Sequence, residues 1–184
     1  MEEKKPKVST TIRSPHTEDL VDHYWGSMNY VFSLIKASEL KAGLILSFYG
    51  ILLNFIFQHM NMVFGTDNTI IFFMFSAGWF ICTVLSIYFS IRCFMPRIEK
   101  RYDRNMFFFG DIVSKFGNEK QFAKYFFETS LDEEELFNQL GQQIFIISKI
   151  ATYKFRNVNR SLKFLAIGLM MLLAAVLAYA LTGF

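Results

Sequence analysis

Residues 42–64 read AGLILSFYGILLNFIFQHMNMVF, a run of 23 residues without a charged side chain. A helix of this length extends about 35 Å, enough to cross a hydrocarbon core of about 30 Å. Residues 70–94 and 162–184 form similar runs, whose only charged residues, Arg92 and Lys163, lie near their ends. Near the end of a span, a long basic side chain such as Arg92 or Lys163 can extend to the interface between lipid and water. A chain of 184 residues is too small to bury three such helices, so we expect three transmembrane spans.

The charges fix an orientation for these spans. All 19 Lys and Arg residues lie on one side of them, and the other side carries only Asp67. Short segments rich in Lys and Arg stay in the cytoplasm. We therefore expect an all-α membrane protein with a cytoplasmic N-terminus and an external C-terminus. Its basic face suits an anionic leaflet or an anionic ligand, and the leaflet is the simpler explanation.

The segment before the first span has two parts. Residues 1–14 are polar and mixed in charge, which is typical of a disordered tail. A cytoplasmic helix is predicted over residues 15–41, capped by Ser14 with Pro15 at its first position, and continuous with the first span. It carries an apolar stripe at three- and four-residue spacing: Leu20, Tyr24, Met28, Phe32 and Ile35. Residues 65–68 predict a short external turn, so that 42–94 forms a transmembrane hairpin.

The cytoplasmic segment 95–161 is expected to be helical. A helix is predicted from Arg97 to Phe116, stopped at Gly117, and a shorter one from Glu119 to about Thr129. Ser130 with Glu133 forms a capping-box pattern. No proline follows, so one helix is expected to continue from there through the third span, residues 162–184.

This last helix carries a seam of alternating four- and three-residue steps, the spacing of a coiled coil. Its members are Phe137, Leu140, Ile144, Ile147, Ala151, Lys154, Val158 and Ser161. Lys154 is the unexpected member. Its stem could pack while its ammonium group reaches a Glu or a lipid phosphate, or it could meet an anion held between helices.

Polar residues form a stripe on each of the first two spans. On the first, the face is formed by Gly43, Ser47, Gly50, Asn54, Gln58 and Asn61. On the second, it is formed by Ser76, Thr83, Ser86 and Ser90. Such stripes favour close helix packing with hydrogen bonds across the contact. Alternatively, Asn54, Gln58 and Asn61 face water in an oligomer and line a membrane pathway.

Enzyme chemistry has little support in this sequence. The three histidines lack the spacing of metal ligands, and no catalytic triad, phosphate-binding glycine loop or metal pair is recognisable. Cys82 and Cys93 lie in the second span, which argues against a structural disulfide. The acidic run 132–135 is explained by its place in the first turn of a helix. We expect no catalytic residue, no metal, no bound cofactor and no nucleic-acid partner.

Several blocks nevertheless resemble a known family. ELKAGLILSFYGILL at residues 39–53 is similar to the entry into the first span of the Pycsar effector transmembrane proteins of bacterial antiphage defence. Residues 95–97 (MPR), 107–112 (FFFGDI) and 139–154 are similar to later blocks of that family, in the same order. The resemblance covers about residues 20–184. At Glu39 the family usually has Asp, so the carboxylate is retained.

The resemblance implies a non-enzymatic effector of the bacterial inner membrane, activated by a cyclic nucleotide that a partner nucleotide cyclase makes. The segment 95–161 would be its sensor region. Candidate ligand-binding cations on or beside the matched blocks are Lys41, Arg97, Lys149 and Lys154. A homo-oligomer within the lipid bilayer is expected. The alternative is a membrane-anchored scaffold that recruits a cytoplasmic partner through its helices, and a hydrolase or nuclease is a more remote one.

Overall fold

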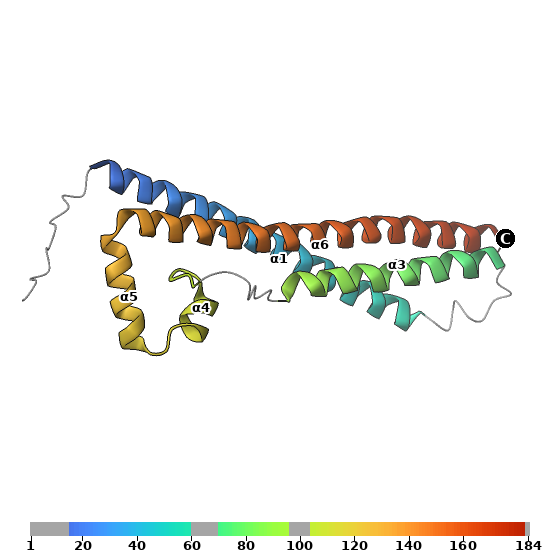
Figure 1. Ribbon diagram of the computed structural model, residues 1–184. Helices are drawn as coiled ribbons and strands as arrows, with labels where there is room; N and C mark the ends of the chain where they lie inside the picture. The colour runs from blue at the N-terminus through green and yellow to red at the C-terminus, as the bar shows by residue number, and fades with distance from the viewer. Residues whose placement is uncertain (1–14, 60–69, 96–103, 183–184) are drawn as a thin grey trace, which may run out of the picture. The chain divides into compact units, whose positions relative to one another are not determined.

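The computed structural model describes residues 15–59, 70–95 and 104–182, and the regular secondary structure in these ranges is entirely helical (Figure 1). The helices are α1 (Pro15–Gln58), α3 (Ile70–Phe94), α4 (Phe109–Ser114), α5 (Glu119–Leu131) and α6 (Glu133–Thr182). They form two compact units. Unit 1 contains residues 1–30 and 103–144, and unit 2 contains residues 31–102 and 145–184. The helices α1 and α6 each contribute to both.

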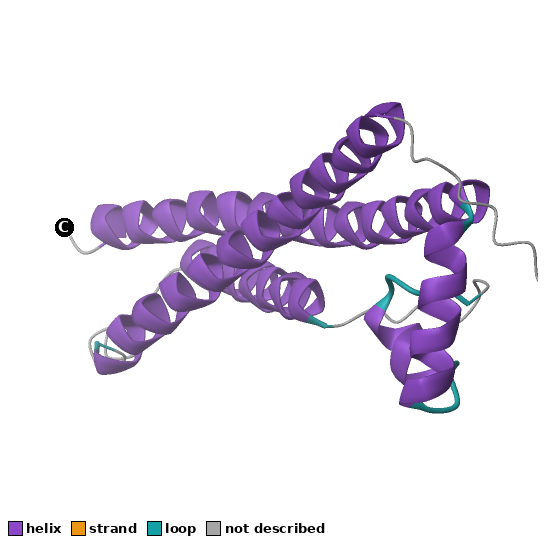
Figure 2. Cartoon of the chain, turned by 90° about the vertical axis from the view of Figure 1, so that its left-hand side faces the viewer, coloured by secondary structure: helices purple, strands orange, loops and turns teal. Residues whose placement is uncertain are grey.

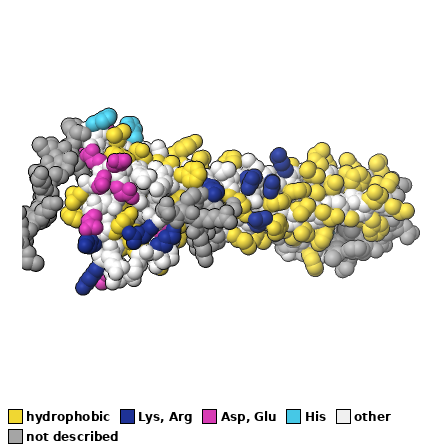
Figure 3. Space-filling view, viewed as in Figure 1, with side chains coloured by type: hydrophobic (Ala, Val, Ile, Leu, Met, Phe, Trp, Pro, Cys, Tyr) yellow, Lys and Arg dark blue, Asp and Glu magenta, His cyan; other side chains and the backbone are white. Residues whose placement is uncertain are grey.

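Three helices are long and apolar enough to cross a membrane, as predicted: α1, α3 and α6. The expected continuity of the helix over residues 15–41 with the first apolar run, and of the last helix with the third apolar run, is confirmed, since α1 and α6 are each a single helix. Within their most apolar segments, only 17%, 22% and 11% of the residues are buried. Hydrophobic side chains therefore cover most of the visible surface of unit 2, while Lys and Arg gather toward one end of it (Figure 3). This surface suits contact with lipid or with further chains.

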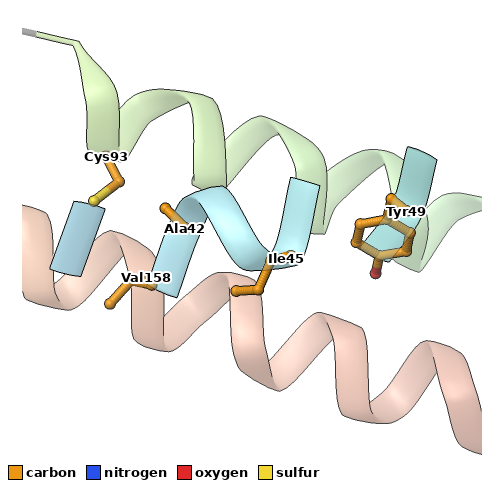
Figure 4. Close-up of a cluster of buried hydrophobic side chains, with 5 residues drawn as sticks. All are labelled: Ala42, Ile45, Tyr49, Cys93 and Val158. Atoms are coloured by element: carbon orange, nitrogen blue, oxygen red, sulfur yellow. The ribbon is translucent and has the colours of Figure 1, made fainter. Parts of the chain in front are cut away.

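In unit 2, parts of α1 and α6 pack together with α3 (Figures 1 and 2). A cluster of buried side chains from all three helices joins them: Ala42, Ile45, Tyr49, Cys93 and Val158 (Figure 4). The backbones of α3 and α6 approach closely at Gly168, where an added Cβ would lie 3.3 Å from the Cβ of Cys82. Small residues at such contacts are how membrane helices pack without a hydrophobic driving force.

The predicted seam on α6 is confirmed. Its buried members are Leu140, Ile147, Ala151, Lys154, Val158 and Ser161, and Phe137 and Ile144 are half-buried. On α1 the predicted stripe is buried at Met28 and half-buried at Leu20, Tyr24 and Ile35, but Phe32 remains 40% exposed. The three- and four-residue spacing therefore identified the inward face of α6 and, except at Phe32, that of α1.

Unit 1 is held together by aromatic contacts. The rings of Tyr24 and Phe137 lie 5.5 Å apart, and the guanidinium of Arg104 lies 4.6 Å from the ring of Phe116 and 4.3 Å from that of Tyr125. Cations over aromatic faces contribute about 0.5–1 kcal/mol or more each. These contacts anchor the segment before α4 to the short helices.

The helix predicted over residues 97–116 is confirmed at Phe109–Ser114, which form α4, but is wrong for residues 104–108. The preceding turn is held by side-chain hydrogen bonds instead. The backbone N–H of Asn105 donates to Asp111 Oδ2 at 3.0 Å, and its side-chain Nδ2 donates to the backbone carbonyl of Gln139 at 2.8 Å. Met106 N donates to Gln139 Oε1 at 3.1 Å. These bonds give the backbone N–H groups of Asn105 and Met106 their partners without a helix. Residues 97–103 of the predicted helix lie outside the described ranges.

The helix predicted from Glu119 is confirmed as α5, which extends to Leu131. The capping role predicted for Ser130 is wrong, because Ser130 Oγ donates to the Phe126 carbonyl within α5. Asp132 takes that role: its Oδ1 accepts a hydrogen bond from Glu135 N at 3.2 Å. The acidic first turn of α6 lies where predicted. The predicted tail at residues 1–14 and the turn at 65–68 lie outside the described residues.

Candidate functional site

Lys154 occupies the most unusual position in unit 2, because its ammonium group joins all three helices. The side chain is 6% exposed. Its Nζ donates to Glu39 Oε1 of α1 at 2.7 Å and to the Cys93 carbonyl of α3 at 2.7 Å. A buried ammonium ion needs such partners, since desolvation otherwise disfavours the charge. Of the two interpretations of Lys154, the structure therefore shows the intramolecular one, with a Glu as partner.

A cluster of three serines lies further along the same contact. Ser86 Oγ donates to the Ser161 carbonyl at 2.9 Å, and Ser161 Oγ donates to the Ser86 carbonyl at 2.8 Å. Ser90 Oγ lies 2.7 Å from Ser161 Oγ. Each hydroxyl proton thus has an acceptor in an otherwise apolar setting. The polar stripe of the second span makes these hydrogen bonds with α6 rather than with the polar stripe of the first span.

Together these groups form a line of polar side chains inside unit 2, which we call the polar core. Its members are Glu39, Tyr49, Thr83, Ser86, Ser90, Lys154, Asn157 and Ser161. The Tyr49 hydroxyl lies against Thr83 and Ser86. Three of its atoms, Tyr49 Oη, Thr83 Oγ1 and Asn157 Nδ2, make no hydrogen bond of ordinary length with described residues. Buried polar atoms without partners cost about 1–3 kcal/mol each, so this packing is not fully satisfied.

The structure does not bring the predicted ligand-binding cations together. Lys41 is exposed on α1, with its Nζ 5.6 Å from the centre of the Phe155 ring. Lys149 is exposed on α6. Lys154 is buried and already paired, and Arg97 lies outside the described residues. Of the four, Lys41 and Lys149 present exposed cations.

The predicted pathway residues lie on the outer surface of unit 2. Asn54 and Gln58 are exposed on α1, as are Ser47 and Gly50 of the same stripe, and Asn61 is outside the described ranges. Two amides therefore project from an apolar helix without burial in their own chain. Lipid offers an amide no hydrogen-bonding partner, so this face calls for water or another polypeptide.

Sequence reasoning missed a basic groove between α1 and α6 in unit 2. The groove has a volume of about 670 Å³, and Arg156, Arg160 and Lys163 line one part of it. Their spacing of four and three residues places them on one helical face, a signal that was present in the sequence. Sequence reasoning also missed the partner of Lys154, because Glu39 is 115 positions away.

The comparisons with known proteins agree with the resemblance seen in the sequence. Residues 23–181 match the family described as the Pycsar effector protein domain. The Pycsar effector protein SaPycTM of Staphylococcus aureus is 30% identical over 140 residues, which cover 76% of this chain and 84% of that protein. No solved structure matches the chain. Because the matched family covers most of the chain, including all three long apolar helices, this protein belongs to the Pycsar effector protein family.

Proposed function

We propose that this protein is a cyclic-nucleotide-responsive membrane effector of bacterial antiphage defence, which impairs the inner membrane when activated. Membership of the Pycsar effector family over residues 23–181 carries this proposal. The three helices long enough to cross a bilayer support it. In this proposal a nucleotide cyclase is the functional partner, acting through its product rather than by contact.

The proposed orientation has the N-terminus in the cytoplasm and the C-terminus outside. It is supported by the 19 Lys and Arg residues, which all lie on one side of the three spans. Juxtamembrane basic residues favour the cytoplasmic side. The cations of the segment that precedes the third span would then be accessible to a ligand made inside the cell.

We also propose that copies of the chain assemble in the membrane with the exposed face of α1 turned toward a pathway between them. Asn54 and Gln58 support this, since both are exposed on a helix of the membrane region. An amide facing hydrocarbon is unfavourable, whereas an amide facing a second copy or a water-filled path can form hydrogen bonds. Asn54, Gln58 and Asn61 are therefore the proposed lining of a pathway between copies.

Activation requires a second packing of the helices that binds the ligand more tightly than the resting one. The polar core is the proposed element that changes. Its unsatisfied amide nitrogen at Asn157 makes the described packing costly, and that cost would be recovered if rearrangement gave it a partner. Since α1 and α6 are single helices of 44 and 50 residues, a shift in one part of either helix is transmitted along its backbone.

Leakage from liposomes tests the proposal directly. The full chain is reconstituted into vesicles loaded with a self-quenching dye, and the four 3′,5′-cyclic nucleotides are added one at a time. We expect at least one of them to cause dye release. If none of the four nucleotides causes dye release, the result contradicts a ligand-gated membrane effector and favours the membrane-anchored scaffold.

The variant Asn54→Leu with Gln58→Leu tests the pathway. We expect it to lose ligand-dependent leakage while retaining assembly and ligand binding, because only the polar lining is removed. The control is Phe55→Leu with Phe57→Leu, which changes two exposed apolar residues of the same helix turn. Leakage equal to that of the unmodified chain in the Asn54 and Gln58 variant would rule out these amides as a pathway lining.

A further inference from the structure

The groove between α1 and α6 combines an apolar wall with a basic one. Val31 and Leu34 of α1 line it on one side, and Phe155 of α6 contributes an aromatic ring. Arg156, Arg160 and Lys163 follow along α6. The volume of about 670 Å³ lies within the range of small-molecule sites, about 300–1,000 Å³.

The cations of this groove are available for binding. Arg156, Arg160 and Lys163 are all exposed. Among the residues that the structure describes, no carboxylate forms an ion pair with any of them. The guanidinium of Arg160 lies 5.6 Å from the centre of the Phe89 ring. That contact orients the side chain without neutralising its charge.

A second hollow among the described residues has the opposite character. It has a volume of about 410 Å³ in unit 1, and Glu18 and Asp22 contribute carboxylates to its lining. An anion placed there would meet like charges, which costs free energy. Of these two hollows, the groove in unit 2 is thus the one whose charge is complementary to an anion.

We propose that this groove is a phosphodiester-binding site. Arg156 and Lys163 are seven residues apart on one helix, about 10 Å along its axis, with Arg160 between them. Arginine forks form paired, charge-assisted hydrogen bonds with phosphate oxygens. The apolar wall of Val31, Leu34 and Phe155 accommodates the uncharged part of the ligand. Lys41, whose Nζ lies 5.6 Å from the Phe155 ring, adds a fourth cation beside it.

Two kinds of molecule carry this chemistry. A 3′,5′-cyclic nucleotide has one phosphodiester and a flat base that can stack on Phe155. An anionic phospholipid has one phosphodiester and acyl chains, and Lys163 is the second residue of the apolar run that begins at Leu162. Basic pockets between membrane helices on the cytoplasmic side bind such headgroups. The nucleotide alternative rests on the proposed function, whereas the lipid alternative is independent of it.

The test compares three full-length chains. The first is unmodified, and the second carries Arg156→Gln, Arg160→Gln and Lys163→Gln. The matched control carries Lys36→Gln, Lys120→Gln and Lys124→Gln, which removes three exposed cations outside the groove. Each is titrated with the four cyclic nucleotides in a neutral detergent by calorimetry. Each is also placed in phosphatidylcholine nanodiscs containing phosphatidylglycerol, and the enrichment of bound phosphatidylglycerol is measured by native mass spectrometry.

We expect the groove variant to lose about a hundredfold or more in affinity for one of the two ligands, while the control retains it. This follows from a loss of about tenfold for each of at least two charge-assisted contacts. A loss of nucleotide affinity identifies the groove as the sensor site, and a loss of phosphatidylglycerol enrichment identifies it as a lipid site. If neither kind of binding differs between the groove variant and the control, the proposal is overturned.

A second variant covers the case in which the triple substitution disturbs folding. Asn159 lines the groove and is exposed, so Asn159→Glu adds a negative charge there without removing any cation. We expect it to weaken phosphodiester binding at least tenfold at unchanged helicity by circular dichroism. Unchanged binding of both ligands in this variant would also contradict the proposal. A failure of dye leakage in the unmodified chain concerns the proposed function alone, because these assays measure binding.

Discussion

Removing Glu39 should destabilise the protein more than removing its partner, Lys154. In Glu39→Ala, the ammonium of Lys154 stays in a site where its side chain is 6% exposed, and the Cys93 carbonyl is its remaining acceptor. In Lys154→Met, the stem is largely retained and no buried charge is left. Glu39 is then unpaired, but its side chain is 38% exposed, so water can solvate it.

The magnitudes follow from these exposures. Breaking a fully buried ion pair from one side costs about 3–5 kcal/mol, and an exposed pair contributes about 0–1 kcal/mol. The pair in this protein is intermediate, so we expect a loss of about 2 kcal/mol for Glu39→Ala and of about 1 kcal/mol for Lys154→Met. The double variant should resemble Lys154→Met, because no buried cation remains. The coupling energy is then about 2 kcal/mol in magnitude.

The assay is reversible unfolding in mixed micelles with increasing sodium dodecyl sulfate, followed by circular dichroism. Asp22→Ala serves as the control, since it removes an exposed carboxylate from the same helix, and we expect a change of less than about 0.5 kcal/mol. The reasoning is refuted if Lys154→Met is more destabilising than Glu39→Ala, or if the effects of the two substitutions simply add.

Two further substitutions test the contact between α3 and α6. Ser161→Ala should lower the free energy of unfolding by about 1–2 kcal/mol, because Ser161 Oγ bonds to both Ser86 and Ser90. Such bonds contribute about 0.6 kcal/mol each on average. No change in the same unfolding assay would contradict the shared network. Gly168→Ala should destabilise by about 1 kcal/mol, since its Cβ would lie 3.3 Å from Cys82 Cβ. At Gly50 an added Cβ would have no atom within 4 Å, so Gly50→Ala should be neutral or stabilising by up to about 1 kcal/mol. Equal effects of the two glycine substitutions would show that close packing at Gly168 is unimportant.

The long helices were predictable because their signals are local and repeated. Length and apolarity identified the helical membrane segments, and the spacing of four and three residues identified the inward face of α6, including Lys154. The absence of proline after Ser130 correctly predicted a single helix through the third apolar run, which the structure describes as far as Thr182. Each of these signals is carried by many neighbouring residues, so no single long-range contact can reverse it.

One error arose where a long-range contact decides the local structure. Residues 104–108 were expected to be helical, but the buried side chain of Gln139 supplies hydrogen bonds that hold a turn. The error at Ser130 has a local cause: Ser130 and Asp132 are both suitable caps, and because α5 extends to Leu131, Asp132 takes that role.

The candidate site was only partly predictable for the same reason. A lysine in an apolar seam indicated that some partner must exist, but nothing local identified Glu39. The polar face of the second span was predicted, yet the helix that would receive its hydrogen bonds was not. The spacing of residues along one helix identifies the face that packs, but it does not identify the helix that packs against that face.

The chain order of the Lys154 contacts has a consequence for biosynthesis. Both acceptors, Glu39 and the Cys93 carbonyl, precede the donor in the sequence. A chain that enters the membrane from its N-terminus therefore has both acceptors in place before the donor is synthesised. The last helix can be accommodated in only one register without leaving its ammonium group unpaired. A copy in which α6 packs out of register loses both acceptors of Lys154, so we expect it to be less stable than the correctly packed chain.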